Sequence, residues 1–251
     1  MTPEEFQHVV NQIKPYTDYV YLHVLGEPLT HPQIGEILKI ASDSGLWVNI
    51  TTNGSRLKMH QEALLSHSVR QINISLHDAE ENVSKDRWGN YLDGVIDFSM
   101  NASTKLYVSL RLWNTTNKKS EEFIQLTTDK ILEKFEVPTG KLNEIKSSKG
   151  VKLAEHIFFQ SSPRFEWPDA TSTPSYTYKT CHALKDHIAI LSDGCVVPCC
   201  LDADANLLLG NIFEQDFVTV LSNPRFQKMK SGFEQHKAVE SFCGTCGFIV
   251  N

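Results

Sequence analysis

The sequence predicts an α/β fold: a partial (β/α) barrel followed by a small cysteine-bearing domain. Strand-like apolar runs alternate with amphipathic helical stretches through the first 160 residues, and those runs are apolar on one face only. The cysteines separate the two parts, because all six lie between Cys181 and Cys246. We expect the barrel to occupy residues 1–165 and the second domain residues 175–251.

The first helix has a clear start signal. Thr2 can cap it, Pro3 suits the first helical position, and Glu4 and Glu5 place negative charge in the first turn. Strands and helices then alternate, which is typical of βαβ units around a parallel sheet. The expected strands are 19–24, 47–52, 71–77, 106–113 and 155–160. The expected helices are 32–44, 57–66 and 120–133, with a further long helical stretch within 82–100.

The expected strands have one apolar and one polar face. Val48 and Ile50 alternate with Asn49 and Thr51, and strands 71–77 and 106–113 repeat this pattern. A sheet covered by helices on both faces would be apolar throughout. One face therefore packs against helices, while the polar face meets water, a ligand or a cofactor. A curved sheet with helices outside fits this pattern, and its active site is expected at the carboxyl ends of the strands.

Polar residues and glycines lie at those strand ends. Glu27 can accept hydrogen bonds from an ammonium group, and Ser75 and Arg111 can bind a carboxylate. Together they suit the two charged ends of an amino acid. Each has a plainer interpretation: Gly-Glu-Pro and Asn-Gly are common turns, and Arg111 can belong to a structural ion pair. The residues at this rim are Gly26, Glu27, Thr52, Asn53, Ser75 and Arg111.

The cysteines have the spacing of a metal site. Cys181 and Cys199 are 18 positions apart, and Cys243 and Cys246 form a Cys-x-x-Cys pair. Segments 188–191 and 195–197 predict a β-hairpin with an Asp-Gly turn that brings the first two cysteines together. Four thiolates can hold zinc or a [4Fe–4S] cluster, and the spacing alone does not choose between them. A site with four ligands leaves out the remaining two cysteines, Cys195 and Cys200. The alternative interpretation of the six cysteines is that they are buried structural residues.

Composition excludes several classes of partner. The net charge is −6 and the isoelectric point is about 5.9, so the chain lacks the basic excess of nucleic-acid binders. No apolar run approaches the length of a membrane helix, and the first residues do not resemble a signal peptide. We therefore expect a cytoplasmic protein with no nucleic-acid or membrane partner.

Several segments resemble the radical S-adenosylmethionine (radical SAM) superfamily with its C-terminal SPASM or twitch extension. Cys181, Gly194 and Cys199 fit the spacing Cys-x(9–15)-Gly-x4-Cys of that extension, and the single closing Cys-x-x-Cys resembles its one-cluster twitch form. The fold implied is a radical SAM barrel followed by a small SPASM β-hairpin-plus-helix domain. The segments that carry the resemblance are 25–32, 52–54, 74–77, 193–200, 209–212 and 243–246.

The resemblance implies two cofactors. Gly26 and Glu27 would contact the amino group of S-adenosylmethionine (SAM), and Ser75 and Arg111 would contact its carboxylate. Thr52 and Asn53 would line the barrel beside it. An auxiliary [4Fe–4S] cluster would be held by Cys181, Cys199, Cys243 and Cys246.

The sequence departs from the superfamily at one essential motif. The catalytic [4Fe–4S] cluster needs Cys-x3-Cys-x2-Cys after the first barrel strand, yet no cysteine precedes Cys181. We expect the first strand and its loop to be missing from this chain, and the chain alone to be inactive. The undecayed remaining motifs indicate a truncated sequence rather than a degenerate pseudoenzyme.

Two classes of function follow from these observations. The first is an oxidoreductase or modifying enzyme that uses a 5′-deoxyadenosyl radical, with an electron donor such as flavodoxin or ferredoxin. Its substrate, which can be a peptide, a sugar or a small metabolite, is not readable from the sequence. No catalytic base can be named. The alternative is a non-catalytic zinc- or cluster-binding scaffold or electron carrier.

Overall fold

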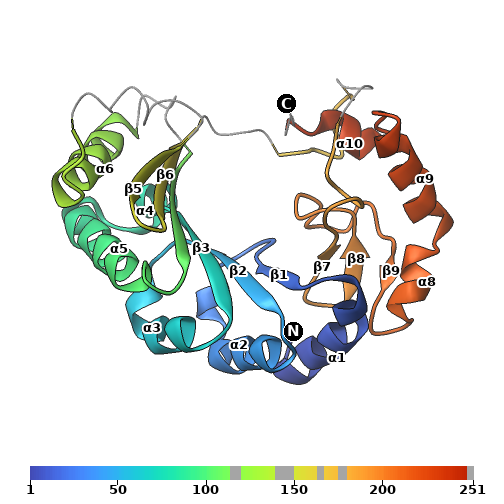
Figure 1. Ribbon diagram of the computed structural model, residues 1–251. Coiled ribbons are helices and arrows are strands. Elements are labelled where there is room, and N and C mark those ends of the chain that lie inside the picture. The colour runs from blue at the N-terminus through green and yellow to red at the C-terminus, as the bar shows by residue number, and fades with distance from the viewer. Residues whose placement is uncertain (114–119, 139–149, 163–166, 175–179, 248–251) are drawn as a thin grey trace. The chain divides into compact units, whose positions relative to one another are not determined.

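A computed structural model describes residues 1–113, 120–138, 150–162, 167–174 and 180–247 (Figure 1). The chain forms two compact units. One contains residues 17–23 and 27–164, and the other contains residues 1–16, 24–26 and 165–251. Among the described residues no helix is long and apolar enough to cross a membrane.

The first unit is built on a six-stranded sheet with the order β1-β2-β3-β4-β6-β5. Each neighbouring pair from β1 to β6 is parallel, and β5 is antiparallel to β6. Helices lie along one face of this sheet (Figure 1). The strands are β1 (Tyr19–Leu22), β2 (Trp47–Thr52), β3 (Val69–Ser75), β4 (Tyr107–Leu112), β5 (Val151–Ala154) and β6 (Ile157–Ser161). The helices are α2 (Ile34–Asp43), α3 (Leu57–Ser66), α4 (Asp78–Asn82), α5 (Trp88–Ala102) and α6 (Glu121–Lys134), with short 3₁₀ turns η2 (Pro28–Thr30) and η3 (Lys85–Arg87).

The two faces of the sheet differ as the alternation predicts. On one face the strand side chains are apolar and fully buried, among them Val48, Ile50, Ile72, Ile74 and Leu110. Rows of mostly polar side chains cross the other face because the strands are in register. The rows that matter for the site join Thr51, Asn73, Ser109 and Phe158 at mid-height, and Ser75, Arg111 and Gln160 at the carboxyl end.

The helix expected within 82–100 is α5, which begins at Trp88, and the structure adds strand β5. Val83 and Ser84 have extended backbones between α4 and η3, so the helical stretch is broken before Trp88. The Trp88 indole donates to the Val83 carbonyl, which stabilises that break. Strand β5 pairs with β6 in an antiparallel ladder, and its four residues are too short for periodicity to reveal.

The second unit combines a small sheet with helices from both ends of the chain. Strands β7 (Ala189–Ile190), β8 (Cys195–Val197) and β9 (Gly210–Asn211) pair antiparallel, and the β7–β8 turn is the expected hairpin. Gly194 in that turn has φ +85°, and a Cβ there would lie 2.4 Å from the Phe213 ring. The helices are α1 (Pro3–Ile13), α8 (Phe217–Leu221), α9 (Pro224–Glu234) and α10 (Ser241–Thr245).

Helix α1 packs within the second unit, which the sequence did not indicate. Thr2 caps its start as expected, and the structure adds a reciprocal bond from Glu5 that completes a capping box. Gln12 then joins it to the β9–α8 connection: its Nε2 donates to the Ile212 carbonyl (3.0 Å) and its Oε1 accepts from the Phe217 N–H (2.6 Å). One side chain therefore satisfies an orphan donor at the first residue of α8.

We predict that Gln12→Ala destabilises the second unit by about 1–3 kcal/mol, because it leaves the part-buried Phe217 N–H unpaired, whereas the Ile212 carbonyl keeps His8 Nε2 at 3.1 Å. Urea denaturation checks this value. Gln7→Ala is the matched control, since the Gln7 amide donates to Asn11 on the same exposed helix surface. Equal effects of the two substitutions would contradict the role given to Gln12.

Candidate functional site

Glu27 is the centre of the hydrogen bonds at the carboxyl end of β2. Its Oε1 accepts from the Leu29 N–H (2.9 Å) and the Thr52 hydroxyl (2.7 Å), and its Oε2 accepts from the Asn53 N–H (2.6 Å). A carboxylate has about four acceptor positions, so three protein donors leave room for one more. Glu27 thus ties its loop to β2 and keeps one acceptor position on Oε2.

The Asn53–Gly54 turn is fixed from two further directions. The Tyr91 hydroxyl on α5 donates to the Asn53 carbonyl (2.7 Å), and the Gly54 N–H donates to the Thr52 hydroxyl oxygen (3.1 Å). Burial, with the nearby charges of Asp78 and Glu27, raises the pKa of Tyr91 well above its usual value, so it remains a donor. Three of the rim residues expected from sequence, Glu27, Thr52 and Asn53, are therefore hydrogen-bonded together.

Ser75 and Arg111 lie directly opposite each other on β3 and β4. The Arg111 guanidinium is largely buried, and its Nε has no hydrogen-bond partner among the residues that the structure describes. Burial lowers its pKa to about 10, so the group is still cationic at neutral pH. It lies over the Trp113 ring, 5.3 Å from the centroid. No carboxylate in the described part of the chain forms an ion pair with Arg111, so the structural ion-pair interpretation has no partner there.

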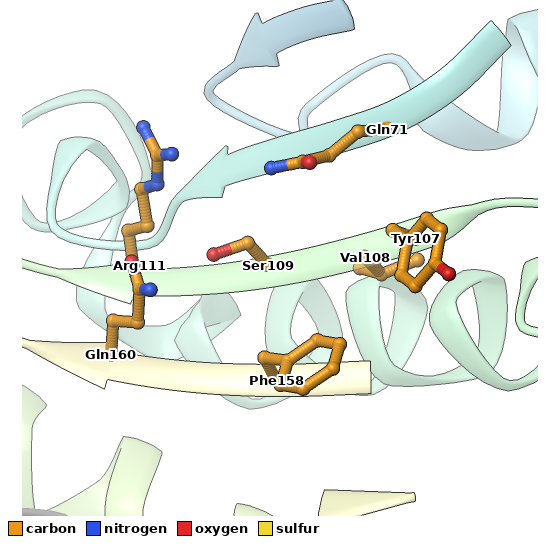
Figure 2. A pocket seen from close by; sticks show the side chains of 7 residues that line it. All are labelled: Gln71, Tyr107, Val108, Ser109, Arg111, Phe158 and Gln160. Atoms are coloured by element: carbon orange, nitrogen blue, oxygen red, sulfur yellow. The ribbon is translucent and has the colours of Figure 1, made fainter. Parts of the chain in front are cut away.

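A hollow of about 100 Å³ opens beside Arg111 on the polar face. Figure 2 shows its side chains, with Arg111 and Gln160 at one end, Tyr107, Phe158 and Gln71 at the other, and Ser109 between them. The sequence analysis assigned no role to Ser109 or Gln160. Their only sequence signal is their place on the polar side of the strand alternation.

His77 adds a titratable group near the same strand ends. Its ring stacks on Trp113 at an interplanar angle of 10°, and Nδ1 lies 3.4 Å from the Trp113 N–H. Its Nε2 lies 3.4 Å from the Asp78 carboxylate. Nδ1 also lies 3.4 Å from the Arg111 carbonyl oxygen, so the ring lies between the end of β4 and the Asp78 carboxylate.

Gly26, the remaining rim residue, has φ +80° and open space where a Cβ would lie. The left-handed backbone explains why glycine stands there, since other residues are strained at this φ.

The six cysteines are all reduced and half-buried. Burial raises the pKa of Cys199 to about 12, and the nearby thiols of Cys200, Cys181 and Cys246 add to the shift. Such a group becomes a thiolate only beside a compensating cation, which is what iron or zinc supplies. Among the described residues no group of three His, Cys, Asp or Glu side chains is close enough to hold a single metal ion. Cysteine thiols are the right donors for a four-thiolate site. The assignment of Cys181, Cys199, Cys243 and Cys246 as its ligands stays a prediction.

Two anchors position the loops that carry these cysteines. Arg225 on α9 makes a bidentate ion pair with Glu240 (2.9 and 3.1 Å), directly before the helix that contains Cys243. The fully buried Asp202 accepts from the N–H groups of Asn206 and Leu207 (both 2.8 Å) and so fixes the loop after Cys200. The sequence analysis missed both, because neither lies in a motif with metal-ligand spacing.

Cys195 differs from the other thiols. Its N–H donates to Asp193 in the hairpin turn, and the Asn211 amide lies 3.9 Å from its sulfur on the paired strand β9. The amide of Asn211 on β9 therefore donates to this sulfur, while the hairpin turn binds the Cys195 backbone.

Comparison with known proteins identifies the cysteine-bearing part. Residues 181–247 match SPASM, described as an iron–sulfur cluster-binding domain. The cysteine-bearing part of the chain is therefore similar to SPASM domains, as the resemblance of its cysteine motifs predicts. An AdoMet-dependent heme synthase from Methanosarcina barkeri is 24% identical, and the match covers 99% of this chain and 80% of that protein.

Solved structures show the same fold. BtrN in an open conformation has a TM-score of 0.57 and 14% identity, covering 99% of this chain and 80% of that chain. SuiB of Streptococcus suis, solved with S-adenosylmethionine bound, has a TM-score of 0.57 and 14% identity, covering 98% and 64%. The predicted fold class, a partial barrel of the radical SAM type followed by a small SPASM domain, is confirmed.

We predict that Gly54→Ala disrupts the rim and destabilises the chain by about 2 kcal/mol or more, through backbone strain and overpacking. Its φ is +78°, and a Cβ would lie 3.0 Å from Ile74 and 3.1 Å from Val95. Gly94→Ala is the matched control on exposed helix α5, where a Cβ meets nothing within 4 Å. Thermal unfolding should show Gly94→Ala to be neutral or stabilising; a loss as large as that of Gly54→Ala would contradict this account.

Proposed function

We propose that this chain forms the SAM-binding sheet and the auxiliary-cluster domain of a radical SAM oxidoreductase or modifying enzyme. The observation that carries the proposal is the SPASM match, since residues 181–247 include all four expected ligands, Cys181, Cys199, Cys243 and Cys246. When bound, an iron–sulfur cluster supplies one-electron transfer or a substrate anchor. The chain's own contribution is to hold the ligands and to position the substrate.

The proposed cofactor residues form two groups. Glu27 offers its remaining acceptor position to an ammonium group, within the loop fixed by Thr52 and Asn53. Ser75 and Arg111, paired across β3 and β4, offer a hydroxyl and a guanidinium to a carboxylate. Gly26 leaves the backbone open before Glu27. The bound cofactor of the structural relative SuiB supports SAM as the ligand.

The first cysteine of the sequence is Cys181, so these 251 residues offer thiolates for the auxiliary cluster alone. We infer that reductive cleavage of SAM depends on a Cys-x3-Cys-x2-Cys set that they do not supply, and that they are inactive without it. The same observation favours the second candidate function, a cluster- or zinc-binding scaffold or electron carrier. The substrate class and a flavodoxin- or ferredoxin-type donor belong to the proposal for the active enzyme.

We predict that anaerobically reconstituted protein shows a sulfur-to-iron charge-transfer absorption band that is lost in Cys199→Ala and in Cys246→Ala. Each substitution removes one of four proposed ligands, whereas Cys195→Ala, the control, should keep the band. A full band in both ligand variants would overturn the assignment.

We predict that Ser75→Ala weakens SAM binding about ten-fold, because it removes a hydrogen bond to a charged carboxylate. Isothermal titration calorimetry of SAM with the reconstituted protein measures this change. Ser66→Ala, on the exposed end of α3, is the matched control and should bind like the unmodified chain. An unchanged dissociation constant in Ser75→Ala, or no binding by the unmodified chain, would contradict the cofactor assignment.

A further inference from the structure

The hollow of Figure 2 contains polar groups that the rest of the chain does not satisfy. Ser109 is 5% exposed, and its hydroxyl has no hydrogen-bond partner within the described residues; the same holds for the Nε of Arg111. Leaving a buried donor unpaired costs about 1–3 kcal/mol, and more for a charged group. The two groups line one cavity, so one ligand can satisfy both.

The charge of the hollow selects the ligand. Its lining contains one cation, Arg111, and no acidic residue. A second guanidinium, that of Arg70, lies 5.5 Å from the centroid of the Tyr107 ring that forms part of the wall. A buried cation with no carboxylate beside it favours an anion. Ser109 and Gln160 can donate to the same anion.

The opposite end of the hollow is aromatic. The rings of Tyr107 and Phe158 lie 6.4 Å apart, with an angle of 29° between their planes, and both line the cavity. These rings offer a flat apolar surface to a conjugated or aromatic group. At about 100 Å³ the hollow is smaller than a typical pocket for a whole ligand, so it suits one end of a molecule.

We propose that this hollow is a substrate subsite for a carboxylate attached to a planar unsaturated group. The carboxylate meets Arg111, Ser109 and Gln160, and the planar group lies against Tyr107 and Phe158. This inference rests on the proposed function, since it names the substrate class for the same polar face. The subsite reaches from the row of Ser75, which contains Arg111 and Gln160, to the next row, where Ser109 pairs in register with Asn73 and Phe158.

A carboxylate in this hollow can come from the substrate or from SAM. Arg111 has three nitrogen groups and can serve both, whereas Ser75 and Ser109 occupy different rows of the sheet. The two serines therefore distinguish the sources. A substrate subsite requires Ser109 for the substrate carboxylate and leaves SAM dependent on Ser75.

Titrations of benzoate and of neutral benzamide, followed by saturation-transfer NMR on the full chain, test the subsite. We expect benzoate to bind at least ten-fold more tightly than benzamide, and Ser109→Ala and Arg111→Gln each to weaken benzoate about ten-fold or more. Ser66→Ala and Arg56→Gln, at exposed positions on or beside α3, are the matched controls and should change nothing. Equal binding of the two probes, no binding of benzoate, or an unchanged affinity in Ser109→Ala would each overturn the proposal.

A second arm titrates SAM into the same variants. Unchanged SAM affinity in Ser109→Ala supports a separate substrate carboxylate, whereas a loss equal to that of benzoate would assign the hollow to the cofactor and overturn the subsite. Because benzoate binding needs no iron–sulfur cluster, a failed cluster reconstitution counts against the proposed function alone, and failed benzoate binding counts against the subsite alone.

Discussion

The burial of one face of the parallel sheet determines where the rest of the first unit can lie. Val48, Ile50, Ile72 and Ile74 are fully buried on that face, so the helices must lie along it. Alternation then places Asn49, Asn73 and Ser109 on the opposite face, where no helical layer satisfies their polar groups. Asn49 is 2% exposed and neither polar atom of its side chain has a partner in the described chain. A polar face of this kind is stable only beside water or a ligand.

At the carboxyl end of the sheet the same geometry produces a set of fixed polar groups. Glu27 binds the end of β2 through three hydrogen bonds, and Tyr91 holds the Asn53 carbonyl from the helical side. The turn is therefore held from both sides before any cofactor arrives. Such preorganisation lowers the entropy lost on binding, because these groups are already ordered.

Period-two alternation made the two-faced sheet and its rim predictable from sequence. The thiol spacing predicted a metal or cluster site, and the resemblance of the cysteine motifs to a known family predicted the SPASM domain. Strand register was not predictable, so the opposition of Ser75 and Arg111 required the structure. The sequence also did not reveal single side chains that contact residues outside their own motif or element. Gln12 contacts residues about 200 positions away, and Arg225 binds Glu240 without any recurring motif. Strand β5 and the break at Val83 depend on contacts with nearby residues, those of β6 and Trp88, that the periodicity of the sequence does not reveal.

We expect the SPASM domain of this chain to hold an iron–sulfur cluster, and its parallel sheet to bind SAM. Metal and acid-labile sulfide analysis of anaerobically purified, reconstituted protein tests it most directly. The account predicts about four iron and four sulfide per chain, the content of one [4Fe–4S] cluster. One zinc per chain with no sulfide would contradict it, and would identify the four thiolates as a structural zinc site.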